Sequence, residues 1–190
     1  GVQTCALPIS TGERVGIGVI GAGFISSRYL ENLTTLFDNV TVLGVADLME
    51  DRAREQAERF GVHAMTVADL LAHPEIQIVV NLTIPAAHAK VAFAAIEAGK
   101  SIYNEKPLAA TREDARKILE MAREKGVLAG GAPDTFLGAG YQTARRLIDD
   151  GAIGTPVAAN AMLLLSGHER WHPNPDFYYQ PGGGPMFDMG

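Results

Sequence analysis

The chain has 190 residues, of which 47% are hydrophobic and 20% charged, and its formal net charge is −6. This is a globular composition, and an acidic balance without a basic cluster argues against a nucleic-acid or anionic-membrane surface. No uninterrupted apolar stretch reaches the roughly 18 residues of a membrane span, and the single cysteine fits a reducing compartment, so we expect a cytoplasmic protein.

The two ends of the sequence look arbitrary. Residues 1–9 resemble the translation of a DNA-sequencing adapter, so we predict that residues 1–10 are not native and that Cys5 is no feature of the protein. The sequence stops at Gly190 within a motif. We therefore expect a fragment broken at both ends.

The first predicted strand, Val15–Ile20, runs into a glycine-rich turn and then into a helical pattern. The turn reads Gly21-x-Gly23-x-x-Ser26, and its strand–turn–helix setting is typical of a dinucleotide site. Gly21 would permit the tight turn, Gly23 would let a pyrophosphate approach the backbone, and Ser26 would let the helix pack on the strand. The residues of this turn predicted to bind cofactor are Gly21, Gly23, Phe24 and Ile25.

A second predicted strand, Val40–Ala46, ends at Asp47. A carboxylate there can accept hydrogen bonds from the adenosine ribose hydroxyls. It would also repel a 2′-phosphate, and Leu48 and Met49 beside it carry no positive charge, so we predict NAD in preference to NADP. Two alternatives stay open here: an ordinary turn with a capping aspartate, and a methyltransferase, which can carry a similar loop.

Strand and helix patterns continue to alternate as far as residue 131. The predicted elements are a helix over Glu50–Phe60, a strand over 62–66, a helical turn over Val67–Ala72, a strand over 76–82, a helix over 85–99, a strand over 100–104, a helix over 111–126 and a strand over 127–131. This order predicts an α/β fold, a Rossmann doubly wound parallel sheet with its ligand-binding loops at the carboxyl ends of the strands.

The regular alternation of strands and helices ends near residue 132. A predicted helix ending at Gly151 is followed by a strand-like run over 157–165 and an irregular stretch over 166–184. We predict an NAD(P)-binding Rossmann domain over 11–131 and the beginning of a substrate and oligomerisation domain over 132–190.

The triplet Glu105-Lys106-Pro107, together with the glycine-rich turn, resembles the Gfo/Idh/MocA family, the glucose–fructose oxidoreductase and inositol dehydrogenase group. Residues 81–88, 147–156 and 182–190 match it as well. The resemblance implies a Rossmann domain followed by a second α/β domain with a mostly antiparallel sheet, of which only the start lies in this sequence.

Lys106 is the first catalytic residue that the resemblance implies. A lysine near both the substrate hydroxyl and the nicotinamide can hydrogen-bond the reacting oxygen and move its proton. Glu105 would line the nicotinamide pocket or orient Lys106, and in relatives a peptide bond next to Pro107 is often cis. The alternative is a surface lysine paired with Glu105.

Asp188 matches the aspartate of the family's substrate motif and is the second catalytic candidate, with a helix N-terminal acid as the alternative. Thr83 and Pro85 would shape the cofactor loop, and His88 would contact the cofactor or serve only as a helix cap. The spacing of His168 and His172 is a poor match to a metal site, so we predict no metal. Together with Trp171 they are assigned only to the substrate pocket.

The combined prediction is an NAD(P)-dependent oxidoreductase, an enzyme that transfers a hydride between nicotinamide and a carbinol carbon of a sugar, polyol or related small molecule. We expect a homo-oligomer at full length, with no nucleic-acid or membrane partner and no turnover by the fragment itself. The alternative is a non-catalytic nucleotide-binding or sensor protein with the same fold.

Overall fold

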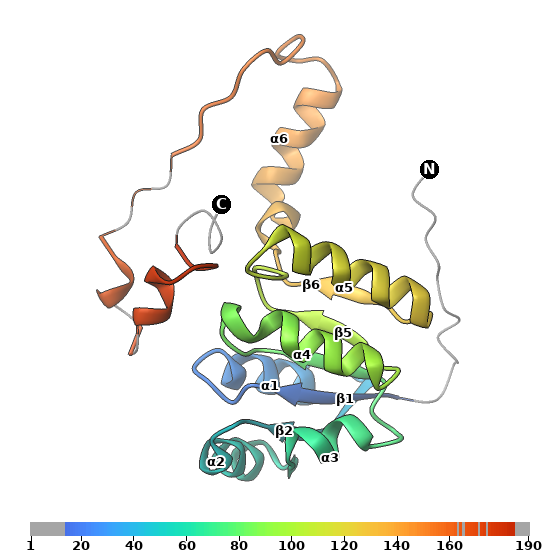
Figure 1. Ribbon diagram of the computed structural model, residues 1–190. Coiled ribbons are helices and arrows are strands. Elements are labelled where there is room, and N and C mark those ends of the chain that lie inside the picture. Colours follow the sequence, from blue (N-terminus) through green and yellow to red (C-terminus); the bar gives the residue numbers. More distant parts are fainter. Residues whose placement is uncertain (1–13, 163, 165, 171, 174, 185–190) are drawn as a thin grey trace. The chain divides into compact units, whose positions relative to one another are not determined.

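A computed structural model describes residues 14–162, 164, 166–170, 172–173 and 175–184 (Figure 1). Six strands form one sheet in the order β3-β2-β1-β4-β5-β6. The pairs β1–β2, β1–β4, β2–β3 and β5–β6 are all parallel, and helices separate the strands along the chain. The predicted Rossmann-like α/β fold is therefore confirmed. The described residues divide into two compact units, one as far as residue 82 and one from residue 83.

The first unit carries the glycine-rich turn. Its elements are β1 Val15–Ile20, α1 Ser26–Thr35, β2 Val40–Ala46, α2 Glu50–Phe60, β3 His63–Ala64, α3 Val67–Ala72 and β4 Ile78–Asn81. β1 pairs with β2 from Val15 opposite Val40 to Ile20 opposite Ala46, and on its other side with β4. Val19, Leu30 and Leu70 are fully buried, and each stabilises the unit by roughly 1.5–3 kcal/mol.

A close approach between α3 and β1 explains one glycine of the first strand. A Cβ on Gly18 would lie 2.7 Å from Leu70 Cδ2 and 3.0 Å from Ile76 Cδ1. Since real Cβ atoms do not approach other heavy atoms so closely, only glycine lets Leu70 pack against β1 here. This packing fixes the middle of the strand that ends at the glycine-rich turn.

The second unit carries the Glu105-Lys106-Pro107 triplet. Its elements are α4 Pro85–Glu97, β5 Ser101–Asn104, α5 Arg112–Lys125, β6 Ala129–Gly131, α6 Ala139–Asp149 and the 3-10 turns η1 Thr135–Leu137, η2 His168–Arg170 and η3 Asp176–Tyr179. Pro85 starts α4, where a missing N–H costs nothing. The Thr111 hydroxyl accepts from the Asp114 N–H at 3.1 Å and so caps the start of α5.

The strand predicted over residues 157–165 is wrong for the part of it that the structure describes. Residues 157–162 and 164 form no strand, and Val157 and Met162 are 95% and 87% exposed. A strand exists only through hydrogen bonds to a neighbouring strand, and no strand follows β6 in the described part of the chain. Residues 163 and 165 lie outside the described residues.

None of the described helices combines the length and the hydropathy that crossing a bilayer requires.

Candidate functional site

In the first unit the glycine-rich turn links the end of β1 to the start of α1. Gly21 has a φ of 107°, in the region that favours glycine, and its N–H donates to the Ala46 carbonyl at 2.8 Å. The Ser26 hydroxyl, which is fully buried, donates to the Gly23 carbonyl at 2.6 Å. The turn is thus held at both ends.

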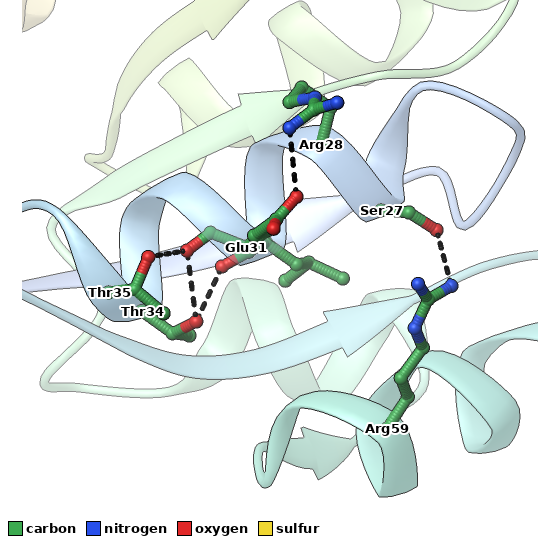
Figure 2. A network of polar contacts seen from close by, with 7 residues as sticks. Ser27, Arg28, Glu31, Thr34, Thr35 and Arg59 are labelled. Carbon is green, nitrogen blue, oxygen red and sulfur yellow. Dashed lines mark hydrogen bonds and ion pairs between the residues drawn. The ribbon is translucent and has the colours of Figure 1, made fainter.

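The start of α1 is also tied to α2. Figure 2 shows the Arg59 guanidinium beside Ser27, to whose hydroxyl it donates at 3.3 Å, and Ser27 in turn donates to Gln56 Oε1 at 3.2 Å. On the solvent side of α1, Arg28 and Glu31 form an ion pair at 3.0 Å (Figure 2). The helix that begins at the turn is therefore fixed through its first residues.

The outer side of the turn is open. A Cβ on Gly23 would meet no atom within 4 Å, and Phe24 and Ile25 are 63% and 40% exposed. No contact within the protein therefore requires a glycine at position 23. The first N–H groups of a helix lack intrahelical partners and favour anions, and α1 has no acidic residue in its first turn. An open backbone cradle of this kind fits the diphosphate of a dinucleotide.

Asp47 joins the end of β2 to the glycine-rich turn. Its Oδ2 accepts from the Ala22 N–H at 2.7 Å, and its Oδ1 accepts from the Met49 N–H at 2.8 Å. Each carboxylate oxygen has about two acceptor positions, so each keeps capacity for a ribose hydroxyl. This hydrogen bond was not predictable from local sequence, because the Ala22 contact spans 25 residues. Ribose binding by Asp47 stays a prediction.

In the second unit, Lys106 lies in a turn that buried side chains hold. The Lys106 N–H donates to Glu105 Oε2 at 2.8 Å, and Asn104 Nδ2 donates to the Leu108 carbonyl at 2.9 Å. Asn104 is fully buried, whereas Glu105 and Lys106 are half-buried. The Lys106–Pro107 peptide bond is cis, as the family resemblance implied. The catalytic role of Lys106 stays a prediction.

His88 connects this turn to the segment before α4. The ring is fully buried, with Nδ1 2.6 Å from the Pro107 carbonyl oxygen and Nε2 2.9 Å from the Thr83 carbonyl oxygen. The sequence left a cofactor contact and a helix cap open for this residue. A cofactor contact by His88, Thr83 or Pro85 stays a prediction. In the structure, both ring nitrogens of His88 contact backbone carbonyl oxygens.

Asn104 was not among the predicted site residues. The signal available in the sequence was a polar residue at the carboxyl end of a predicted strand. Asn81 has the same position at the end of β4, and the structure shows that both side chains are fully buried. Next to Asn104, burial and the negative charges of Glu105 and Asp134 raise the pKa of Tyr103.

The remaining predicted residues lie toward the end of the chain. Asp188 and Trp171 fall outside the described residues. His168 stacks on Tyr178 with ring centroids 3.9 Å apart, and the His172 ring lies 5.5 Å from that of His168. In the described ranges, no three His, Cys, Asp or Glu side chains are grouped so that they could hold a metal ion.

Comparison with known proteins identifies related sequences and structures. The profile of the Gfo/Idh/MocA family, described as an oxidoreductase family with an NAD-binding Rossmann fold, matches residues 15–131. Inositol 2-dehydrogenase 3 of Saccharopolyspora erythraea is 35% identical over 151 residues, which cover 78% of this chain and 44% of that protein. The chain thus spans less than half the length of this curated relative.

Two solved structures are also similar. The crystal structure of GenD2 from gentamicin A biosynthesis, in complex with NAD, aligns with a TM-score of 0.69 and 30% identity over 74% of this chain and 40% of that one. The myo-inositol dehydrogenase of Lactobacillus casei, in complex with NAD(H) and myo-inositol, aligns with a TM-score of 0.69 and 27% identity over 75% of this chain and 43% of that one.

Proposed function

The chain belongs to the Gfo/Idh/MocA oxidoreductase family, with its NAD-binding Rossmann fold, and from this premise we propose that the protein oxidises a carbinol carbon of a polyol or sugar. The hydride would pass to the nicotinamide of NAD. The inositol dehydrogenases among its relatives support a cyclic polyol as the first substrate class to test.

The observation that carries the proposal is the position and setting of Lys106. It follows directly on β5 at the carboxyl end of the strand, where α/β proteins bind ligands. Its backbone N–H is held by Glu105, and the next carbonyl groups along the chain are held by His88 and Asn104. A half-buried amine on a turn held in this way fits a proton-transfer role better than a freely moving surface lysine would.

The residues that would hold the cofactor belong to the first unit. The open turn at Gly23 and the start of α1 would take the pyrophosphate, and Asp47 would accept from the adenosine ribose hydroxyls. A bound nicotinamide supplies the hydride acceptor. The charge of Asp47 would disfavour a 2′-phosphate, so we expect NAD to bind more tightly than NADP.

Lys106 would handle the proton. In the oxidation, its neutral Nζ accepts the hydroxyl proton as the carbon–hydrogen bond breaks and the carbonyl forms, and in the reduction its ammonium returns that proton. Once it carries that proton, the ammonium group also stabilises the oxygen on which negative charge develops. Asp188 would contribute from the substrate side, and the second domain would supply the oligomer interface.

The test is a comparison of Lys106→Met with Lys90→Met, a matched change at an exposed lysine of α4, in the complete enzyme that carries this sequence. NADH formation is followed with myo-inositol and a panel of sugars. We expect Lys106→Met to lower kcat by about 10²-fold or more, with NADH affinity little changed, and Lys90→Met to behave as wild type. Near-normal turnover of Lys106→Met would remove this residue from the mechanism. Tight cofactor binding without turnover of any substrate would favour the non-catalytic alternative.

A further inference from the structure

The turn that carries Lys106 is held by two buried side chains that the proposed chemistry does not use. His88 contacts the Pro107 carbonyl oxygen at 2.6 Å, and Asn104 donates to the Leu108 carbonyl at 2.9 Å. Both side chains are fully buried. Partly buried carbonyl groups that a donor within the protein holds rarely give up that partner, because its loss leaves a desolvation penalty. The Pro107–Leu108 and Leu108–Ala109 peptide groups are therefore fixed in orientation.

His88 fixes this turn relative to a second backbone segment. Its other ring nitrogen lies 2.9 Å from the Thr83 carbonyl oxygen, just before α4. A carbonyl oxygen only accepts, so each contact needs a proton on the ring nitrogen that it joins. The doubly protonated ring donates to both carbonyls at once, whereas the neutral ring donates to one. In either state the imidazole fills the space between the two segments.

We infer that His88 and Asn104 are positioning residues, which set the reach of Lys106 by fixing the backbone on its C-terminal side. On the N-terminal side the Lys106 N–H is already held by Glu105 Oε2 at 2.8 Å. The backbone of Lys106 thus lies between fixed points. This inference rests on the proposed catalytic role of Lys106.

The effect on catalysis follows from the geometry. A displacement of a catalytic group by about 1 Å can cost about 10²-fold in rate. Removing either donor frees a carbonyl beside Lys106, so the turn can rotate and carry the amine away from the reacting oxygen. Cofactor affinity should change little in a variant of Asn104, which lies outside the glycine-rich turn and is not among the predicted cofactor contacts.

The experiment is a double-mutant cycle in the complete enzyme, with His88→Gln and Asn104→Asp made alone and in the Lys106→Met background. Asn104→Asp keeps the shape and removes the donor, while His88→Gln keeps a single donor group. His63→Gln, at an exposed histidine of β3, is the matched control. We expect each single variant to lower kcat by about 10–10²-fold, with no further loss in the Lys106→Met background and with unchanged NADH affinity in Asn104→Asp.

A second readout does not depend on turnover. Hydrogen exchange of the amides in residues 104–108 should be faster in His88→Gln by about tenfold, with α5 unchanged. Full multiplication of the kcat losses in the double variants, or unchanged exchange in the turn, would overturn the positioning role. Near-normal turnover of Lys106→Met is a different result, because it refutes the proposed catalytic role itself, while the exchange data still decide whether His88 holds the turn.

Discussion

Asp47 is predicted to carry two separable tasks, and two substitutions distinguish them. Its carboxylate accepts from the Ala22 and Met49 N–H groups at 2.7 and 2.8 Å. Hydrogen bonds to a charged group contribute about 1.5–3 kcal/mol each, and we take the lower end because the side chain is only half-buried. Asp47→Ala loses both bonds and should lower the free energy of unfolding by about 3 kcal/mol. Asp47→Asn keeps one carbonyl acceptor and should lose about half of that.

The cofactor preference should follow a different order. Both substitutions remove the negative charge, so both should weaken the discrimination against NADPH to a similar degree. Urea unfolding of the two variants measures the first task, and parallel titrations with NADH and NADPH measure the second. Asp38→Ala, at an exposed aspartate, is the control. The reasoning is refuted if both variants unfold like wild type, or if wild type itself binds NADPH more tightly than NADH.

Two further predictions concern stability. Gly18→Ala should lower the free energy of unfolding by about 1–3 kcal/mol, because the new Cβ would lie 2.7 Å from Leu70 Cδ2. Gly140→Ala is the control and should not lower it, because a Cβ there would meet no atom within 4 Å. Equal melting temperatures of the two variants would contradict this prediction. Burial lowers the pKa of Lys100 from its ordinary 10.5, so between the lowered value and 10.5 the unfolded chain binds more protons and the free energy of unfolding rises with pH. Urea unfolding at mildly and strongly alkaline pH should show a smaller rise in Lys100→Met than in wild type, and an equal rise would be the contrary result.

The sequence was sufficient for those features that depend on local pattern. Alternation of apolar runs with helical periods predicted the order of the elements, because residues close together in the sequence specify each strand and each helix. The turn at Gly21 was predictable for the same reason. Its strand and its helix adjoin it in the sequence.

Tertiary hydrogen bonds were not predictable in this way. The anchoring of Ala22 by Asp47 spans 25 residues, and the contact of His88 with Pro107 spans 19. No local spacing encodes either, so the sequence left the task of His88 open between two alternatives. The strand predicted over 157–165 is absent from its described residues for a related reason. Its apolar composition favours a strand, but a strand forms only where a neighbouring strand can pair with it.

Gly23→Ala tests most directly whether the turn at Gly23 receives the cofactor diphosphate. The φ angle of Gly23 is not in the left-handed region, and a Cβ there meets no protein atom within 4 Å. Alanine should therefore leave the free energy of unfolding unchanged or raise it by about 0.4–1 kcal/mol. NADH affinity, measured by fluorescence titration, should fall by about tenfold or more, because the methyl group would occupy the space through which the pyrophosphate approaches the backbone. An equally stable variant that binds NADH as tightly as wild type would contradict the account.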